Sequence, residues 1–466
     1  MQRSAIAILS IAAAVCVSCG RTGFDTAAMK PTDRSVPAYR APGDWIAAEA
    51  IPFSPDSPES FNAAVAGLVE ELDGRVELLG IGEPLHGGEG FLLLRNRLFQ
   101  RLAEAHGFGA IAVESDFFRG RLVDEFVSGR GPASYEEVRE EGFSHTFGRL
   151  DANRELVEWM RSRNADPSRP TRLRFYGFDG PMEMIGTPSP RRLVLFALDY
   201  LASADRPAAE ARRARIEPLL GDDAAWEDPA ASTDPSKAFG SSPAAAALRV
   251  ETEELIADLR ARRPALAADE GRDRYLEAVH HAEMARHLLN YHAALARRSE
   301  ARIAEMLGIR DLMMADTLAY IATLECGRGK VLVFAHNSHL KRGKAEWQLG
   351  PHALAWWPAG AHLDSMLGAR YAVVGAGLGV SEDNGIGVPE PGTLEALLTA
   401  APGPARFIPT HRGTQFPPGT LPAIRARSGS ARNPGYFPLD ARSFTDYDWL
   451  AVLDSTSYSR GAPPLP

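Results

Sequence analysis

Short apolar runs alternate with amphipathic segments through the first part of this chain, and this alternation limits the folds it can adopt. Strand-like runs occur at residues 76–81, 110–114 and 173–178. Apolar residues at helical spacing occur at 61–72, 91–106, 118–127 and 153–164. Strands that alternate with helices are typical of a parallel sheet with helices on both faces. We therefore expect an α/β protein with three layers, α/β/α, and a mostly parallel central sheet.

The alternation stops between about residues 191 and 325, where Ala, Arg, Glu and Leu dominate. Helical patterns occupy 244–262 and 272–297, separated from the earlier part by a stretch rich in Pro, Gly and Ser at 221–243. Strand-like runs return at 331–335, 371–378 and 449–453. A strand so near the C-terminus indicates that the chain re-enters the same sheet. We expect one α/β domain over residues 46–466, with a helical subdomain inserted at about 191–325.

Residues 1–19 have the pattern of an export signal. Arg3 supplies a short basic region, and residues 5–17 form an apolar run of roughly 13 residues, too short to cross a bilayer comfortably. The stretch Cys16-Val17-Ser18-Cys19-Gly20 resembles a bacterial lipobox in which Cys19 would carry the lipid, with ordinary cleavage as the alternative. Residues 20–45 are expected to form a flexible linker. These patterns predict an exported bacterial protein, either periplasmic or anchored in the membrane as a lipoprotein.

Composition argues against several kinds of partner. The 60 acidic and 51 basic residues are dispersed along the 466-residue chain and give a net charge of -9. Without a basic stripe interleaved with aromatic residues, nucleic acid is not an expected partner. The three cysteines lack metal-binding spacing, and the histidines of 272–297 lack the His-Glu-x-x-His pattern. We therefore expect neither a metal nor another cofactor.

Ionisable side chains follow the strand-like runs at the points where the runs end. Because the carboxyl ends of parallel strands meet at one edge of a sheet and frame its ligand crevice, we expect these side chains to lie close together. A single histidine in a Gly-rich loop is more often a turn residue, but the recurrence at four strand ends favours a functional site. The residues at these ends are Glu83, His86, Glu114, Asp179, His336 and His339.

Seven motifs follow one another along the chain. They are LGIGEPLHG at 79–87, LRNRL at 94–98, VESD at 113–116, ELVEWMR at 155–161, RFYGFD at 174–179, RDLMMA at 310–315 and VFAHNSHL at 333–340. Taken in order, they resemble the motifs of the erythromycin esterase family, and the resemblance covers about residues 76–455. The family's usual Thr before the first motif's histidine, and its Glu four residues after that histidine, are replaced here by Leu85 and Gly90.

The resemblance implies a hydrolase that opens the lactone ring of macrolides in resistance-conferring members, with water activated by a histidine instead of a serine nucleophile. His86 falls on the position of the catalytic base. Glu83, Arg95, Glu114 and His336 fall on positions that line the family's site. The family name does not identify the substrate of this chain.

The residue chemistry agrees with ester hydrolysis. A histidine with a pKa of about 6.5 can take a proton from water at neutral pH. Glu83 or Glu114 would orient the imidazole of His86. Arg95 would stabilise an oxyanion or hold a carboxylate in place, and His336 would donate to the carbonyl or support its neighbours. We expect two further residues, His339 and Asp179, to contact the substrate.

Two other functions were compared with this one. The chain has no Gly-x-Ser-x-Gly motif, which argues against a serine hydrolase of the α/β class. The second alternative is a non-catalytic protein that binds haem or a glycan in the same crevice, and fold alone does not decide between binding and catalysis. A polar cluster of this size exceeds what passive binding of an apolar ligand needs. We therefore expect a small-molecule ester or lactone as the partner.

Overall fold

The computed structural model describes residues 38–169, 171–182, 186–417 and 424–465. The predicted signal peptide, Cys19 and most of the predicted linker lie outside these residues. The linker was expected to end at residue 45, but helix α1 (Pro42–Glu49) already begins at residue 42. It has a proline at its first position, where proline favours the start of a helix. Trp45 within this helix is fully buried, and its indole N–H donates to the carbonyl of Pro409. Apolar anchoring thus outweighs the linker-like composition from Pro42 onward.

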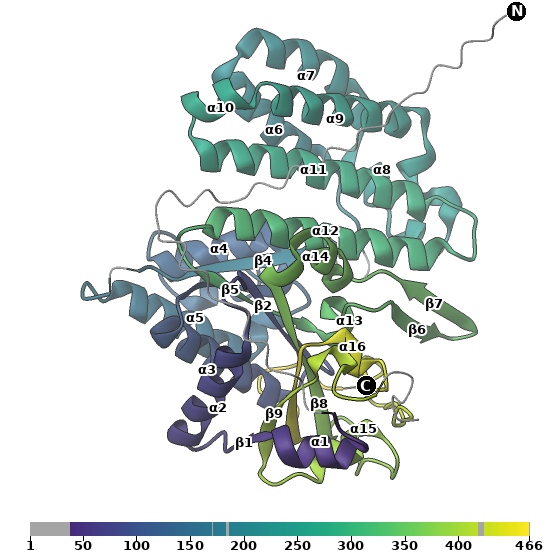
Figure 1. The fold of residues 1–466 in the computed structure, drawn as a ribbon. Coiled ribbons are helices and arrows are strands. Elements are labelled where there is room, and N and C mark those ends of the chain that lie inside the picture. Colours follow the sequence, from purple (N-terminus) through teal and green to yellow (C-terminus); the bar gives the residue numbers. More distant parts are fainter. Residues whose placement is uncertain (1–37, 170, 183–185, 418–423, 466) are drawn as a thin grey trace, which may run out of the picture. The chain divides into compact units, whose positions relative to one another are not determined.

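A sheet of eight strands in the order β1-β9-β10-β8-β2-β5-β3-β4 forms the centre of the described fold (Figure 1). The strands from β10 to β4 are parallel to one another, whereas β9 runs antiparallel to β10 and β1 antiparallel to β9. The predicted mostly parallel sheet is confirmed. The bounds are β1 (Ile51–Phe53), β2 (Leu78–Glu83), β3 (Phe108–Asp116), β4 (Arg174–Asp179), β5 (Lys330–His336), β8 (Tyr371–Val380), β9 (Ala405–Pro409) and β10 (Trp449–Ser455).

Alternate side chains of the central strands enter two separate apolar cores, one on each face of the sheet. In β2, Leu79 and Ile81 pack into one core and Leu78 into the other. Successive side chains of a strand point to opposite faces of the sheet. Because both faces are covered here, both sets of side chains are apolar. Helices α2 (Pro58–Glu71), α3 (Glu89–Ala105) and α5 (Asp151–Ala165) cover the first face, while α12 (Arg302–Glu325) and α14 (Ala359–Leu367) cover the second. The predicted three layers are confirmed.

Every element that the structure describes between residues 191 and 325 is helical. These helices pack around a third apolar core of their own. The last of them, α12, also contacts the sheet, because Leu318 lies in the second core while Met313 lies in the third. The bounds before α12 are α6 (Arg191–Ala204), α7 (Arg206–Leu220), α8 (Asp223–Trp226), α9 (Pro243–Ala261), α10 (Arg263–Asp269) and α11 (Arg272–Leu295).

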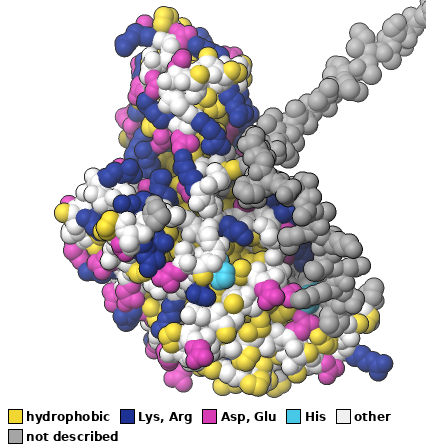
Figure 2. Space-filling model, turned by 60° about the vertical axis from the view of Figure 1, so that its left-hand side comes forward, with side chains coloured by type: hydrophobic (Ala, Val, Ile, Leu, Met, Phe, Trp, Pro, Cys, Tyr) yellow, Lys and Arg dark blue, Asp and Glu magenta, His cyan; other side chains and the backbone are white. Residues whose placement is uncertain are grey.

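The remaining elements contribute to the first or the second core, or form a separate two-stranded sheet. No helix in the described part of the chain combines the length and apolarity needed to span a membrane. On the face shown in Figure 2, acidic and basic side chains are intermixed. The remaining bounds are α4 (Phe117–Ser128), α13 (Asn337–Leu340), β6 (Ala345–Leu349), β7 (His352–Trp356), α15 (Leu394–Thr399) and α16 (Ser443–Asp446).

Candidate functional site

Parallel pairing brings the predicted ionisable side chains to one edge of the sheet. Glu83 ends β2 directly opposite His336, which ends β5. The neighbouring strand β3 has an irregular register against β4 between Val113 and Asp116, and Glu114 lies in this irregularity. A bulge bends a strand and redirects its side chains. The sheet therefore places Glu83, Glu114 and His336 around the loop that carries His86.

His86 is the accessible member of this cluster. Its side chain is 41% exposed, whereas those of Glu83 and Glu114 are each 5% exposed. Nδ1 of His86 lies 2.7 Å from Oε1 of Glu83. Because a carboxylate accepts, this contact assigns the proton to Nδ1 and leaves Nε2 with a lone pair. Nε2 lies 3.8 Å from Oε1 of Glu114.

The two glutamates and the histidine differ in how their charge is balanced. Burial opposes the charged form of His86, but the carboxylates of Glu114 and Glu83 outweigh it and raise the pKa of His86 above its usual range. Burial also raises the pKa of Glu83, and this exceeds the opposing effect of the contact with His86. The second carboxylate oxygen of Glu83 is buried without a hydrogen-bond partner among the described residues.

Glu114 is held ionised by cations. Its Oε2 accepts the backbone N–H of His336 at 2.8 Å, and its Oε1 lies 3.4 Å from Nε2 of His339 and 3.2 Å from Nη2 of Arg310. Burial would raise the pKa of Glu114, but His339, His86 and Arg310 outweigh it and hold the pKa well below its usual range. The carboxylate therefore keeps its charge at neutral pH.

His339 is a cation in this setting. Its Nδ1 lies 2.8 Å from Oδ1 of Asp311. Burial disfavours the charged imidazole, yet Asp311 and Glu114 outweigh burial and raise the pKa of His339 to about 10. His339 is itself buried, so little of its surface is exposed for the predicted contact with substrate. Its clearest effect is a fixed positive charge beside Glu114.

Asp179 does not reach an exposed surface, contrary to its expected contact with substrate. It is fully buried, and its carboxylate accepts from Nε and Nη2 of Arg310 at 3.0 and 2.6 Å. The ring of His145 lies 3.3 Å away on the same carboxylate. Burial works against ionisation here, but Arg310 and His145 lower the pKa of Asp179. Asp179 therefore holds Arg310 toward Glu114.

His336 and Arg95 lie at the site with their polar atoms already engaged. Nε2–H of His336 donates to the carbonyl of Gly435 at 2.9 Å, and Nδ1 accepts the backbone N–H of Ser338. Burial, with His86 nearby, lowers the pKa of His336 to about 3, so the ring is neutral. Nε and Nη2 of Arg95 both donate to Oδ1 of Asn96, and the guanidinium lies 4.8 Å from the ring centre of Phe334. His336 therefore has no N–H available for the expected oxyanion role, whereas the guanidinium of Arg95, held by Asn96, borders a small cavity together with Glu83 and Glu114.

A cavity of about 20 Å³ lies between Glu83, Arg95 and Glu114. Rings of Phe147 and Phe334 form part of its wall. Its size suits a single water molecule. The three charged residues thus border one small internal space, which Gly87 of the His86 loop also lines.

Three site residues were not singled out from the sequence. Arg310 and Asp311 stand in the RDLMMA motif, which was the available signal for them. His145 and the following Thr146 have φ values of 56° and 60°. Left-handed backbone at such residues is uncommon and is often found at functional sites. Nothing in the local sequence predicts this conformation.

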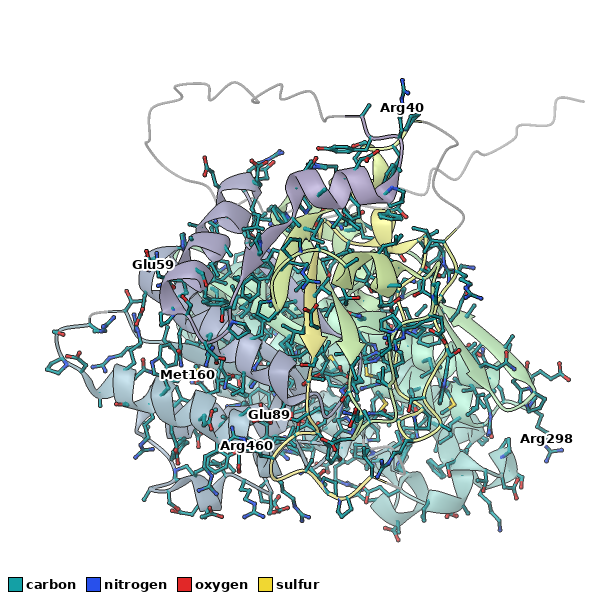
Figure 3. All side chains as sticks on the ribbon, turned by 90° about the horizontal axis from the view of Figure 1, so that it is seen from below. Arg40, Glu59, Glu89, Met160, Arg298 and Arg460 are labelled. Atoms are coloured by element: carbon teal, nitrogen blue, oxygen red, sulfur yellow. The ribbon has the colours of Figure 1, made fainter. Side chains whose placement is uncertain are left out.

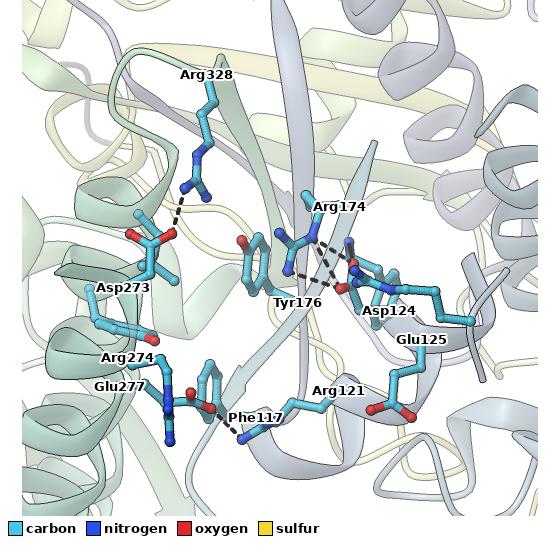
Figure 4. A pocket seen from close by; sticks show the side chains of 15 residues that line it. Phe117, Arg121, Asp124, Glu125, Arg174, Tyr176, Asp273, Arg274, Glu277 and Arg328 are labelled. Carbon is cyan, nitrogen blue, oxygen red and sulfur yellow. Dashed lines mark hydrogen bonds and ion pairs between the residues drawn. The ribbon is translucent and has the colours of Figure 1, made fainter. Parts of the chain in front are cut away.

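A larger cleft of about 250 Å³ lies elsewhere, among α4, β4, α11 and α12 (Figure 4). Its arginines are compensated by acids: Arg121 pairs with Glu277 and Arg328 with Asp273, each at 2.5 Å. Arg174 pairs with Asp124 in the same way. Among its described lining residues there is no histidine. This cleft offers no group for proton transfer at neutral pH, so the cluster around His86 is the better candidate for chemistry.

Comparison with known proteins shows the family to which this chain belongs. The erythromycin esterase family model matches residues 103–456. The chain belongs to the erythromycin esterase family. It is 24% identical over 344 residues to erythromycin esterase type II of Escherichia coli, covering 71% of this chain and 76% of that protein.

Two solved structures have a similar fold. A Bacillus cereus protein matches with a TM-score of 0.65 and 16% identity over 90% of this chain and 98% of its own. A histidine-to-asparagine mutant of the erythromycin esterase EreC, in its open conformation, matches with a TM-score of 0.59 and 16% identity over 84% of this chain and 93% of its own. The resemblance inferred from the motifs is confirmed.

Membership in the erythromycin esterase family supports an esterase or hydrolase that acts on a small-molecule ester. It does not favour the non-catalytic binding alternative. In the described parts of the chain, no group of three or more His, Cys, Asp or Glu side chains has an arrangement that could hold a metal ion.

Proposed function

We propose that this protein hydrolyses a carboxylic ester or lactone with water activated by His86 and without a covalent intermediate on serine. The observation that carries this proposal is the contact of Nδ1 of His86 with Glu83, which leaves Nε2 as the basic nitrogen of a half-exposed ring. Glu83 maintains the tautomer and stabilises the imidazolium, as the orienting carboxylate does in a catalytic triad.

In the proposed reaction, Nε2 of His86 takes a proton from water while the water oxygen attacks the ester carbonyl carbon. The resulting tetrahedral intermediate collapses with cleavage of the bond between the carbonyl carbon and the ester oxygen. The imidazolium returns its proton to the leaving alkoxide. The products are an acid and an alcohol, or a single hydroxy acid from a lactone. A positioned general base contributes roughly 10² to 10⁴ to the rate.

In this proposal Arg310 and His339 act through Glu114. Both cations approach the same oxygen of Glu114, which lies 3.8 Å from Nε2 of His86. They keep this carboxylate ionised, so that it stabilises the imidazolium that forms when His86 takes the proton. The engaged nitrogens of His336 support a structural role for this residue, and Arg95, which borders the same cavity as Glu83 and Glu114, is proposed to hold a carboxylate in place.

The E. coli relative is named for erythromycin, so a macrolide lactone is the first substrate to test. We also propose export of the chain, with a lipidated Cys19 joined by a linker to the α/β domain and its helical insertion. The basic and apolar pattern of residues 1–19 supports this location. Replacement of Cys19 by Ala should move the protein from the membrane fraction to the soluble fraction.

The mechanism is tested by offering purified protein a panel of macrolides and p-nitrophenyl esters, with and without chelator. Addition of one water to the substrate is followed by mass spectrometry. His86→Asn should lower kcat by roughly 10² to 10⁴ with unchanged thermal stability. His362→Asn, on α14, is the matched control and should retain activity. Full turnover by His86→Asn would contradict the mechanism, and a Soret band without turnover would support haem binding instead.

A further inference from the structure

The segment Asn433-Pro434-Gly435-Tyr436-Phe437, here called the bridging segment, contacts both loops that carry the site histidines. Nδ2 of Asn433 donates to the backbone carbonyl of His86 at 3.1 Å. The backbone N–H of Phe437 donates to the carbonyl of Pro84 at 2.6 Å. The carbonyl of Gly435 accepts from Nε2 of His336 at 2.9 Å. Five consecutive residues thus hold the ends of β2 and β5 at the same time.

Asn433 is itself anchored by a chain of buried amides. It donates to Oδ1 of Asn384 at 2.9 Å, and Nδ2 of Asn384 donates to Oγ of Ser381 at 2.8 Å. Ser381 directly follows β8, which is the strand paired with β2. Asn384 is fully buried and Asn433 nearly so. The backbone of His86 is therefore tied to the end of the neighbouring strand through side-chain hydrogen bonds.

The other side of the His86 loop is held by the C-terminal segment. The backbone N–H of Ser459 donates to the carbonyl of Gly87 at 2.9 Å. One residue further, Arg460 pairs with Glu89 at 2.6 Å, and these two residues lie side by side in Figure 3. This second attachment does not involve Asn433. Loss of the Asn433 side chain should therefore shift the His86 loop without releasing it.

We propose that Asn433 is a positioning residue that keeps the His86 ring against Glu83. Glu83 belongs to a buried strand, whereas His86 lies in a loop after that strand, so their 2.7 Å contact depends on where the loop backbone is held. The hydrogen bond from Asn433 acts on that backbone directly. This inference rests on the proposed role of His86 as the base. A displacement of about 1 Å at a reacting group can lower a rate by about 10².

The test compares Asn433→Ala with Asn164→Ala. Asn164 is also a buried amide that donates to backbone carbonyls, those of Val127 and Leu173, and neither belongs to the site. With p-nitrophenyl acetate, Asn433→Ala should lower kcat by about 10- to 100-fold and leave KM within about 2-fold. Its His86 pKa, followed by NMR with His86→Asn for assignment, should move toward the ordinary value of about 6.5.

Asn164→Ala should lower the melting temperature to a similar extent and leave both kcat and the His86 pKa unchanged. Asn433→Leu retains the side-chain volume without the N–H donors, and it replaces Asn433→Ala if that variant does not fold. Wild-type kcat and His86 pKa in the folded Asn433 variant would overturn the inference. If wild type hydrolyses no probe but the His86 pKa still responds to the Asn433 variant, positioning stands and the hydrolase proposal fails.

Discussion

Two buried glutamates contact the same histidine, and their surroundings shift their pKa values in opposite directions. Glu83 has a raised pKa because burial dominates around it, while cations hold Glu114 ionised. Paired carboxylates that titrate differently are a common basis for separate chemical roles. Here the difference assigns orientation of His86 to Glu83 and a permanent negative charge to Glu114.

Glu83→Gln should move the acid limb of the pH–rate profile to lower pH. A base works only when neutral, so kcat/KM falls as pH drops through the pKa of His86, which the carboxylates raise above its usual range. Removing one carboxylate lowers that pKa, so the variant should remain active at lower pH. The pH-independent value of kcat/KM should also fall, because the tautomer of His86 is less well defined. Glu77→Gln, directly before β2, is the control, and an unmoved acid limb in Glu83→Gln would contradict the assignment.

Arg310→Met should reduce the free energy of unfolding by about 3–5 kcal/mol, as measured by urea denaturation. The change leaves the carboxylate of Asp179 fully buried without its guanidinium. The double variant Arg310→Met/Asp179→Leu should recover part of this loss. Arg274→Met, which breaks an exposed pair with Glu270, should change stability by about 1 kcal/mol or less. Equal effects of the two single variants would refute the buried pairing.

At the scale of elements, strands β2 and β8 separate toward their carboxyl ends. Their pairing ends at Ile81 and Val374. Beyond that point Asn337 of α13 takes over, with Nδ2 donating to the carbonyl of Ala376 and Oδ1 accepting its N–H. Gly82 leaves room for this amide, since a Cβ there would lie 2.1 Å from Oδ1 of Asn337. The amide of Asn337 thus replaces strand pairing at the point where β2 and β8 separate.

Gly82→Ala should destabilise the protein by about 1–3 kcal/mol and lower activity. The added methyl group displaces Asn337 and thereby disturbs the ends of three adjacent strands. Gly43→Ala is a suitable control because a Cβ at that position meets nothing within 4 Å. Thermal unfolding and esterase assays on both variants provide the comparison. An unaltered melting temperature in Gly82→Ala would show that the amide is not confined as described.

At the scale of the whole described fold, helix α1 packs against the second apolar core of the sheet through Trp45 and Ile46. Trp45 contacts Phe416 and Phe444 edge-on, at ring centroid distances of 6.0 and 5.4 Å. These rings come from segments about 370 to 400 residues later in the chain. Helix α1 is therefore part of the folded domain and not of the linker.

Trp45→Ala should cost about 3–5 kcal/mol of unfolding free energy, because it removes a large buried side chain and leaves a cavity. Trp357→Ala, at an exposed tryptophan, should cost less than about 1 kcal/mol. Urea denaturation of the two variants measures the difference. If both variants unfold at the same urea concentration, α1 does not contribute to the core as proposed.

Local pattern in the sequence determined the class of fold and most of the site's members. Alternating apolar runs such as 76–81 and 331–335 report strands buried on both faces, and their parallel order alone brings Glu83 next to His336. His86 and Glu114 follow from the same rule. The predicted end of the linker is wrong because Pro42 and Gly43 continue the linker-like composition of the preceding residues, whereas helix α1 is stabilised by distant rings that contact Trp45.

The tertiary structure decided which polar atoms of those residues are available. Arg310 reaches Glu114 from a helix almost 200 residues later, and the carbonyl of Gly435 takes the N–H that His336 was expected to offer. Two nitrogens of Arg95 donate to Asn96 and its guanidinium lies over Phe334, so only part of this side chain faces the cavity beside Glu83. Spacing along the chain reports which face a residue occupies. Which atoms are donors or acceptors there, and which groups are charged, depends on the partners that other segments of the chain bring to that face.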